Sequence, residues 1–299
     1  MNKTEKIFFF TGKGGVGKST VSALCALHLA NSGKSTLLVS LDPAHNLQDI
    51  FKKNFSEKEN KVLDNLFVIQ VNTERQIDKY LQNTIERVEQ MYQYQSAFGM
   101  KNYFKILKKS PGLEEYAIVQ AFIRIVENNQ NFDHLIFDMP PTALTMRFFN
   151  MPANGLLWIN ELSRLRKAII EKHQIISKVK FGKKEIETDK VSNQLSKLKS
   201  RHEELFELFK SVDTKINVVL NPDELSVNEA LNISQALAKL KIKVAHYVLN
   251  KNTYSVDKSL YPFDVLPISY GKKNLTGIEN LQNFLSEEQT TLTINRCIK

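Results

Sequence analysis

One stretch near the start of the chain decides the fold: Thr11-Gly12-Lys13-Gly14-Gly15-Val16-Gly17-Lys18-Ser19-Thr20. It follows the apolar run Ile7–Phe10 and precedes Val21–Leu27, a segment typical of a helix. From Gly12 to Ser19 it fits the pattern G-x-x-x-x-G-K-[ST], in which a strand passes through a glycine-rich loop into a helix. The sequence therefore predicts a phosphate-binding loop (P-loop) here.

The residue types of this loop suit ATP and Mg²⁺. We expect four glycines to adopt positive φ, so that successive N–H groups point into one concavity: Gly12, Gly14, Gly15 and Gly17. Lys18 would bring a positive charge to the β- and γ-phosphates, and the Ser19 hydroxyl would ligate Mg²⁺. The amino-terminal end of the following helix would face the same phosphates.

Strand-like runs recur along the chain with helical patterns between them. Most are continuously apolar, which is typical of strands buried on both faces of a parallel sheet. We therefore predict an α/β fold: a mostly parallel central sheet flanked by helices, as in P-loop NTPases, with an inserted helical subdomain. The predicted strands are Ile7–Phe10, Thr36–Leu41, Phe67–Val71, His134–Asp138, Ile216–Leu220, Val244–Leu249 and Asp264–Ile268.

Polar residues follow several of these runs, where ligands of parallel sheets bind. Asp42 follows the second run and is suited to orient an attacking water or hold a metal-bound water. Asp138 ends a Walker-B-like strand and would bind Mg²⁺ through water. We expect residues 139–147 to form a loop that senses the γ-phosphate. Asn250 suits either an adenine contact or a turn, and the residues alone leave this open.

Two long stretches without strand patterns, about 74–128 and 153–213, predict helical insertions within one domain spanning 1–299. Apolar residues in and near them would form either an exposed groove for a client or ordinary core. The candidates are Phe98, Met100, Phe104, Leu156, Leu157 and Trp158.

Composition narrows the function classes. The net charge is +9, and residues 160–215 carry fourteen basic and nine acidic side chains without any nucleic-acid-binding motif. This helical stretch is either a solvated surface or a contact with anionic lipid or a partner, and we expect no nucleic acid. We expect a cytoplasmic protein, since neither a signal peptide nor a long apolar span is present. Cys25 and Cys297 are too few for a zinc site.

Three segments together resemble the ArsA/Get3 family of arsenite-pump ATPases and tail-anchored-protein targeting factors: Gly12–Thr20, Asp42–Leu47 and Phe137–Phe148. The resemblance implies a homodimer in which Lys13 reaches the nucleotide of the other subunit, while Gly12 to Thr20, Val16 included, cradle the phosphates. It implies that Asp42 is the catalytic carboxylate and that Asp138 begins the second switch. It also implies an adenine contact for Asn250 and a position near the nucleotide for Asp223.

The chain departs from the family in two places. Its second switch reads Met139-Pro140-Pro141-Thr142-Ala143-Leu144, where the family usually has Thr-Ala-Pro-Thr-Gly-His, so we expect a stiffer loop. The paired cysteines of the family's zinc clamp are missing, as is a cysteine cluster for a metalloid.

The leading hypothesis is therefore an ATPase whose nucleotide state controls a helical surface for a membrane-protein client or a membrane partner. The alternatives are the catalytic subunit of an anion efflux pump and a non-catalytic, nucleotide-dependent scaffold.

Overall fold

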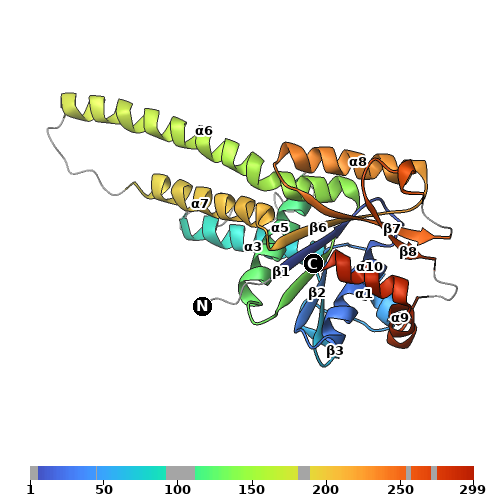
Figure 1. Cartoon of the computed structure of the whole chain (residues 1–299). Coiled ribbons are helices and arrows are strands. Elements are labelled where there is room, and N and C mark those ends of the chain that lie inside the picture. Colours follow the sequence, from blue (N-terminus) through green and yellow to red (C-terminus); the bar gives the residue numbers. More distant parts are fainter. Residues whose placement is uncertain (1–5, 45, 92–111, 181–188, 254–256, 271–274) are drawn as a thin grey trace. The chain divides into compact units, whose positions relative to one another are not determined.

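A computed structural model describes residues 6–44, 46–91, 112–180, 189–253, 257–270 and 275–299 (Figure 1). They fall into two compact units: residues 1–148 with 212–299, and residues 149–211. Four residues discussed above lie outside the described ranges: His45 of the Asp42–Leu47 motif, Phe98, Met100 and Phe104.

The first unit is built on one eight-stranded sheet of order β3-β4-β2-β5-β1-β6-β7-β8. Every pairing is parallel except that of β3 with β4. All seven expected strands are present, which confirms the α/β prediction, and β3 is an edge strand that the sequence did not reveal. The strands are β1 (Lys6–Thr11), β2 (Thr36–Ser40), β3 (Asn60–Leu63), β4 (Leu66–Gln70), β5 (His134–Asp138), β6 (Thr214–Leu220), β7 (Val244–Asn252) and β8 (Val265–Ser269).

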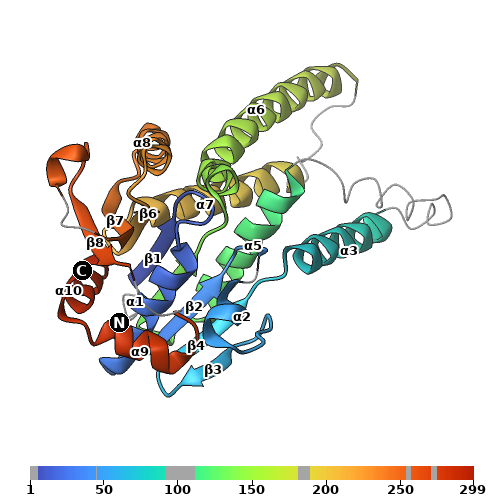
Figure 2. The same ribbon diagram turned by 90° about the vertical axis from the view of Figure 1, so that its right-hand side faces the viewer.

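Helices cover both faces of this sheet. Figure 2 shows α1, α9 and α10 on one face and α8 on the other. Within the described residues, the helices of the first unit are α1 (Lys18–Asn31), α2 (Asn46–Phe51), α3 (Thr73–Met91), α5 (Leu113–Asn128), the start of α6 (Thr142–Lys180), α8 (Glu224–Lys239), α9 (Ile278–Leu285) and α10 (Glu288–Cys297), with a short 3-10 helix, η1 (Lys258–Leu260).

Successive side chains of β1 pack against the helices on the two faces of the sheet. Phe8 and Phe10 face α1 and are completely buried in its cluster. Phe9 points to the opposite face, where its ring lies 5.3 Å from that of Phe137 and 5.5 Å from that of Phe122. Because successive side chains of a strand point to opposite faces, this apolar run fixes β1 at the centre of the sheet. The P-loop that follows β1 is therefore held on a rigid base.

Two free thiols, Cys25 of α1 and Cys297 of α10, are buried next to each other in the same layer. Burial raises the pKa of the Cys25 thiol well above its usual value. Among the residues that the structure describes, no group of three or more His, Cys, Asp or Glu side chains is placed to hold a metal ion.

In the second unit, the described residues form the rest of α6 and α7 (Lys190–Lys210), which run antiparallel to each other. The rings of Phe149 and Phe209 meet edge to face at 5.0 Å. Near the other end, the Arg166 guanidinium donates to the Asp189 carboxylate at 2.9 Å, and that carboxylate also caps α7. This ion pair and cap hold the pKa of Asp189 well below its usual value. None of the helices in the described ranges is long and apolar enough to cross a bilayer.

Candidate nucleotide site

The P-loop takes the conformation that its glycines allow. The φ angles of Gly12, Gly15 and Gly17 are 147°, 81° and 95°, as expected. The expectation was wrong for Gly14, which does not adopt positive φ and lies exposed in open space. A Cβ atom at Gly12 would overlap the carbonyl oxygen of Val219 in β6, so glycine is needed there for the close approach of two strands as well as for the turn.

Four predicted side chains come together beyond the carboxyl ends of the central strands. Lys18 and Ser19 begin α1 directly after the P-loop, whereas Asp42 and Asp138 follow or end the neighbouring strands β2 and β5. All four are buried, with exposed fractions of 5%, 7%, 5% and 0%. Burial lowers the pKa of Lys18, and the negative charges of Asp138 and Asp42 oppose that change.

Asp138 is the most strongly perturbed group of this cluster. Burial raises its pKa to about 7; the Ser19 hydroxyl and the Lys18 ammonium oppose the rise, and the Asp42 charge adds to it. In the described part of the chain neither carboxylate oxygen has a hydrogen-bond partner of good geometry. A buried, unpartnered carboxylate beside a hydroxyl and a second carboxylate is a set of hard oxygen donors, which fits Mg²⁺.

Two hydrogen bonds that the sequence did not predict hold Asp42 in place. Its Oδ1 accepts a hydrogen bond from the Ala44 N–H at 2.9 Å, which fixes the turn. Its carbonyl oxygen accepts one at 3.3 Å from the amide of Gln70, the last residue of β4. Gln70 is only 3% exposed, and its own amide oxygen has no partner among the described residues. The available signal was a polar residue inside the apolar run Phe67–Val71.

A β-bulge in β7 brings two side chains back to the P-loop. The predicted strand ends at Leu249, which would place Asn250 after it. In the structure β7 continues to Asn252, so Asn250 lies within the strand. The pairing with β8 is irregular between Leu249 and Asn252, and Lys251 has φ 55°. Bulges of this kind change the direction of side chains.

As a result, the Asn250 amide donates to the Val16 carbonyl at 2.8 Å, and the Lys251 ammonium donates to the Gly15 carbonyl at 3.0 Å. Lys251 is not among the residues predicted from the sequence. A Cβ atom at Gly17 would overlap the Asn250 amide, which shows how closely the two segments pack.

The remaining predicted residues lie apart from the buried cluster or at its rim. Asp223 is exposed and caps α8 by accepting the Ser226 N–H at 2.8 Å, and no described contact joins it to the cluster. Lys13 is half-buried, and its carbonyl accepts from the Lys18 ammonium at 3.3 Å. Thr20 is half-buried in the first turn of α1.

The segment after Asp138 is shorter than the predicted loop over 139–147. Only residues 139–141 are non-helical, because α6 begins at Thr142 and the Pro141 carbonyl accepts the first backbone bonds of this helix. Alanine at position 143 thus lies in a helix, where it is favourable, and not in a flexible loop. The Arg147 guanidinium donates to the Glu115 carboxylate at 2.6 Å and so joins α6 to α5.

Comparison with known proteins agrees with this geometry. A family model for anion-transporting ATPases matches residues 5–259. ATPase GET3C of Arabidopsis thaliana is 29% identical over 262 residues, covering 83% of this chain and 67% of that protein. ATPase ASNA1 homolog 2 of Paramecium tetraurelia is 30% identical over 275 residues, covering 86% and 79%. The putative arsenical pump-driving ATPase 2 of Aquifex aeolicus is 26% identical over 302 residues, covering 93% and 97%.

The matched region contains the P-loop, Asp42, Asp138 and the bulge at Asn250. The chain belongs to the ArsA/Get3 family of anion-transporting ATPases and is an ATPase.

Proposed function

We propose that the chain is a Mg²⁺-dependent, cytoplasmic ATPase that acts as a homodimer, and that its nucleotide state controls a client-binding surface on its helices. The observation that carries the proposal is the convergence of Lys18, Ser19, Asp42 and Asp138 from three adjacent strands onto one P-loop. Phosphoryl transfer needs chiefly positioning and charge stabilisation, and this cluster offers both.

Each side chain has a role that fits its surroundings. Lys18, already stripped of water, would exchange the Lys13 carbonyl for phosphate oxygens. Ser19 and Asp138 would hold Mg²⁺, which when bound supplies positive charge to the phosphates. Asp42, held by Ala44 and Gln70, would orient the attacking water. Asn250 and Lys251 would keep the loop carbonyls turned away from the phosphates.

The homodimer rests on Lys13. An ordinary P-loop has no need of a lysine at this position, and in the described structure the local contact of Lys13 is made by its backbone carbonyl. The side chain is therefore available to act on a nucleotide bound by a second copy, as the family resemblance implies.

The client surface rests on an exposed apolar stripe of α6 in the second unit. Trp158, Leu162, Leu165 and Ile169 are spaced four, three and four residues apart and so share one helical face. Their exposed fractions are 72%, 46%, 58% and 48%. The neighbouring Ile159 lies about 100° further round the helix and is buried, so the stripe adjoins the packed face without being part of it. Contiguous exposed apolar residues indicate a binding surface.

The anion-pump alternative has weaker support. One relative is named as an arsenical pump-driving ATPase, but both cysteines of this chain are buried away from solvent. A metalloid would need accessible thiolates. The buried cysteines speak against a metalloid, and the exposed apolar stripe suits a hydrophobic client, so we favour a client over an anion.

Measurements of ATP turnover test the proposal. The variant Asp42→Asn distinguishes a catalytic ATPase from a nucleotide-dependent scaffold, and added peptide or arsenite distinguishes a client-binding ATPase from an efflux subunit. We expect Asp42→Asn to lower kcat about a hundredfold or more while ATP still binds, because only water orientation is lost. A hydrophobic transmembrane peptide should raise wild-type turnover, and arsenite should not. The matched control is Asp64→Asn, which removes a 96% exposed carboxylate and should leave turnover unchanged.

Equal turnover of wild type and Asp42→Asn would point to a nucleotide-dependent scaffold. Stimulation by arsenite alone would point to an efflux subunit. Either result would overturn the proposal.

A further inference from the structure

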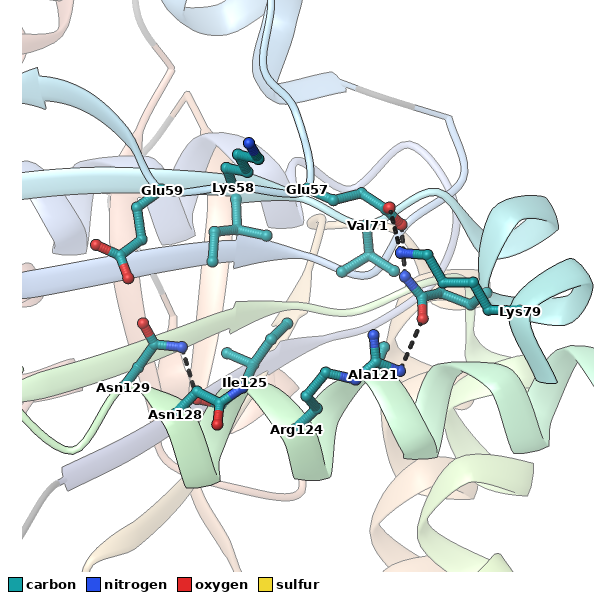
Figure 3. A pocket seen from close by; sticks show the side chains of 12 residues that line it. Glu57, Lys58, Glu59, Val71, Lys79, Ala121, Arg124, Ile125, Asn128 and Asn129 are labelled. Carbon is teal, nitrogen blue, oxygen red and sulfur yellow. Dashed lines mark hydrogen bonds and ion pairs between the residues drawn. The ribbon is translucent and has the colours of Figure 1, made fainter. Parts of the chain in front are cut away.

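A cavity lies in the first unit, and none of the four residues of the nucleotide cluster lines it. It has a volume of about 450 Å³ and lies between the segment preceding β3, the end of β4, α3 and α5 (Figure 3). Its walls are apolar where Ile69, Val71, Ala121 and Ile125 line it, and each of these is at least nine-tenths buried. Charged and amide groups stand around that apolar surface. Nothing in the ATPase mechanism uses this cavity.

One buried amide oxygen in it lacks a partner. Asn129 is 4% exposed, and its Nδ2 donates to the Ile125 carbonyl at 2.7 Å, while no described group donates to its Oδ1. The amide cannot be turned round, because its oxygen would then face the Ile125 carbonyl. Figure 3 shows the Oδ1 atom directed into the cavity, toward Glu59.

A second acceptor faces it. The Glu59 carboxylate extends toward Asn129 in Figure 3, and in the described ranges it forms no ion pair or hydrogen bond. Glu57, its neighbour two residues earlier, differs, because it accepts from Gln76 at 2.5 Å and from Lys79 at 3.0 Å. One end of the cavity therefore presents two acceptors, one of them buried, that receive no hydrogen bond from the residues that the structure describes.

The other end offers a donor. The Arg124 guanidinium uses one N–H to donate to the Gln76 amide oxygen at 2.9 Å, and its other donors have no partner in the described structure. Gln76 is 6% exposed and is held at both ends by Arg124 and Glu57, which fixes this part of the wall. An acidic group could thus be bound here in bidentate fashion.

We propose that this cavity binds an organic ammonium ion on an aliphatic stem, and most tightly one that carries an acidic group at its far end. The ammonium donates to Asn129 Oδ1 and Glu59, the stem lies on Ile125 and its apolar neighbours, and the acidic group meets Arg124. A divalent metal ion fits less well, since Mg²⁺ and Ca²⁺ take six or more oxygen ligands and the protein supplies two groups here.

Calorimetric titration with three probes of matched length tests the proposal on the full chain: ε-aminocaproate, hexylamine and hexanoate. We expect ε-aminocaproate to bind most tightly, hexylamine more weakly and hexanoate not measurably. Neither Mg²⁺ nor Ca²⁺ in excess should displace the amines. Absence of saturable binding, hexanoate binding as tightly as hexylamine, or displacement by either metal would overturn the proposal.

Two exposed substitutions locate the binding. Glu59→Gln should weaken both amines about tenfold, the scale of a lost charge-assisted hydrogen bond. Arg124→Gln should remove the advantage of ε-aminocaproate over hexylamine and leave hexylamine binding intact. The matched control is Glu74→Gln, which neutralises an exposed glutamate of α3 outside the cavity. Equal effects of Glu59→Gln and Glu74→Gln would show that the amines bind acidic surface non-specifically, and the cavity site would be rejected.

Discussion

At the scale of single residues, the Asn250 amide is committed to the P-loop backbone, because its Nδ2 donates to Val16 and its side chain packs against Gly17. We therefore predict that Asn250→Ala weakens ATP and inorganic triphosphate alike, by about tenfold, since losing a buried partner costs about 1–3 kcal/mol. Calorimetry with both ligands measures this. A loss confined to ATP would instead support the adenine contact that the family resemblance implies.

A second residue-scale prediction concerns Asp138, whose pKa rises from 3.8 to about 7 through burial. Between these values the folded protein keeps a proton that the unfolded chain has released, so the contribution of Asp138 to stability falls as pH rises. Without nucleotide and Mg²⁺, Asp138→Asn should therefore stabilise the protein at about pH 8, by about 1–4 kcal/mol, while abolishing turnover.

Thermal unfolding of both proteins across this pH range provides the check. The wild-type Tm should fall relative to that of the variant as pH rises from about 4 to about 8. Parallel profiles for the two proteins would show that Asp138 carries no such penalty.

Residues of the site differ in how far the sequence can predict them. Lys18 and Ser19 are set by one contiguous loop, and Asp42 and Asp138 by the rule that ligands bind beyond strand ends. Lys251 reaches Gly15 only because β7 contains a bulge, and such a bulge leaves no local signal in the sequence. Residue types thus predict the reactive groups of the site better than they predict the residues that hold those groups in position.

At the scale of elements, two predictions failed because the sequence carries no clear local signal: strand β3 was not predicted, and residues 139–147 were predicted as a loop. β3 has only four residues, and Val62 alone is buried, so no apolar run announces it. The helix beginning at Thr142 was hidden by two prolines, which suggested a loop. Pro141 instead precedes the helix and offers its carbonyl to the first turn; its missing N–H breaks no hydrogen bond of the helix. Long, strongly apolar strands were predictable because both of their faces are buried.

The apolar stripe of α6 yields the element-scale prediction. Changing Leu162 and Leu165 together to serine should abolish stimulation by a transmembrane peptide and weaken its binding tenfold or more. The reason is that a leucine side chain that becomes buried under the bound peptide contributes about 1.5–3 kcal/mol. Basal turnover and Tm should stay unchanged, because both side chains are exposed.

Peptide-binding and turnover assays measure this, with Lys167→Ser as the control on another face of the same helix. Undiminished peptide binding by the double variant would place the client surface elsewhere. A lowered Tm would show instead that the stripe is core.

At the scale of the whole molecule, the question is whether Lys13 acts within its own subunit or across a dimer. The two cases differ when Lys13→Ala and Asp42→Asn are mixed, because each variant lacks a different part of a complete site. If Lys13 acts across a two-fold interface, a mixed dimer contains one site with an intact Asp42 and a lysine from the partner. If Lys13 acts on its own nucleotide, neither site of the mixed dimer is complete.

We predict that each variant alone is nearly inactive and that the mixture recovers about a quarter of wild-type turnover, since random pairing makes half of the dimers mixed and each has one working site. Steady-state ATP turnover over a range of mixing ratios measures this, and recovery should peak at equal amounts. Lys13→Ala mixed with Lys18→Ala is an independent test of the same point. In its mixed dimers the site with an intact Lys18 faces a partner with an intact Lys13, so the same recovery is expected only if Lys13 acts across the interface. No recovery in either mixture would confine Lys13 to its own subunit and remove the main argument for a dimeric switch.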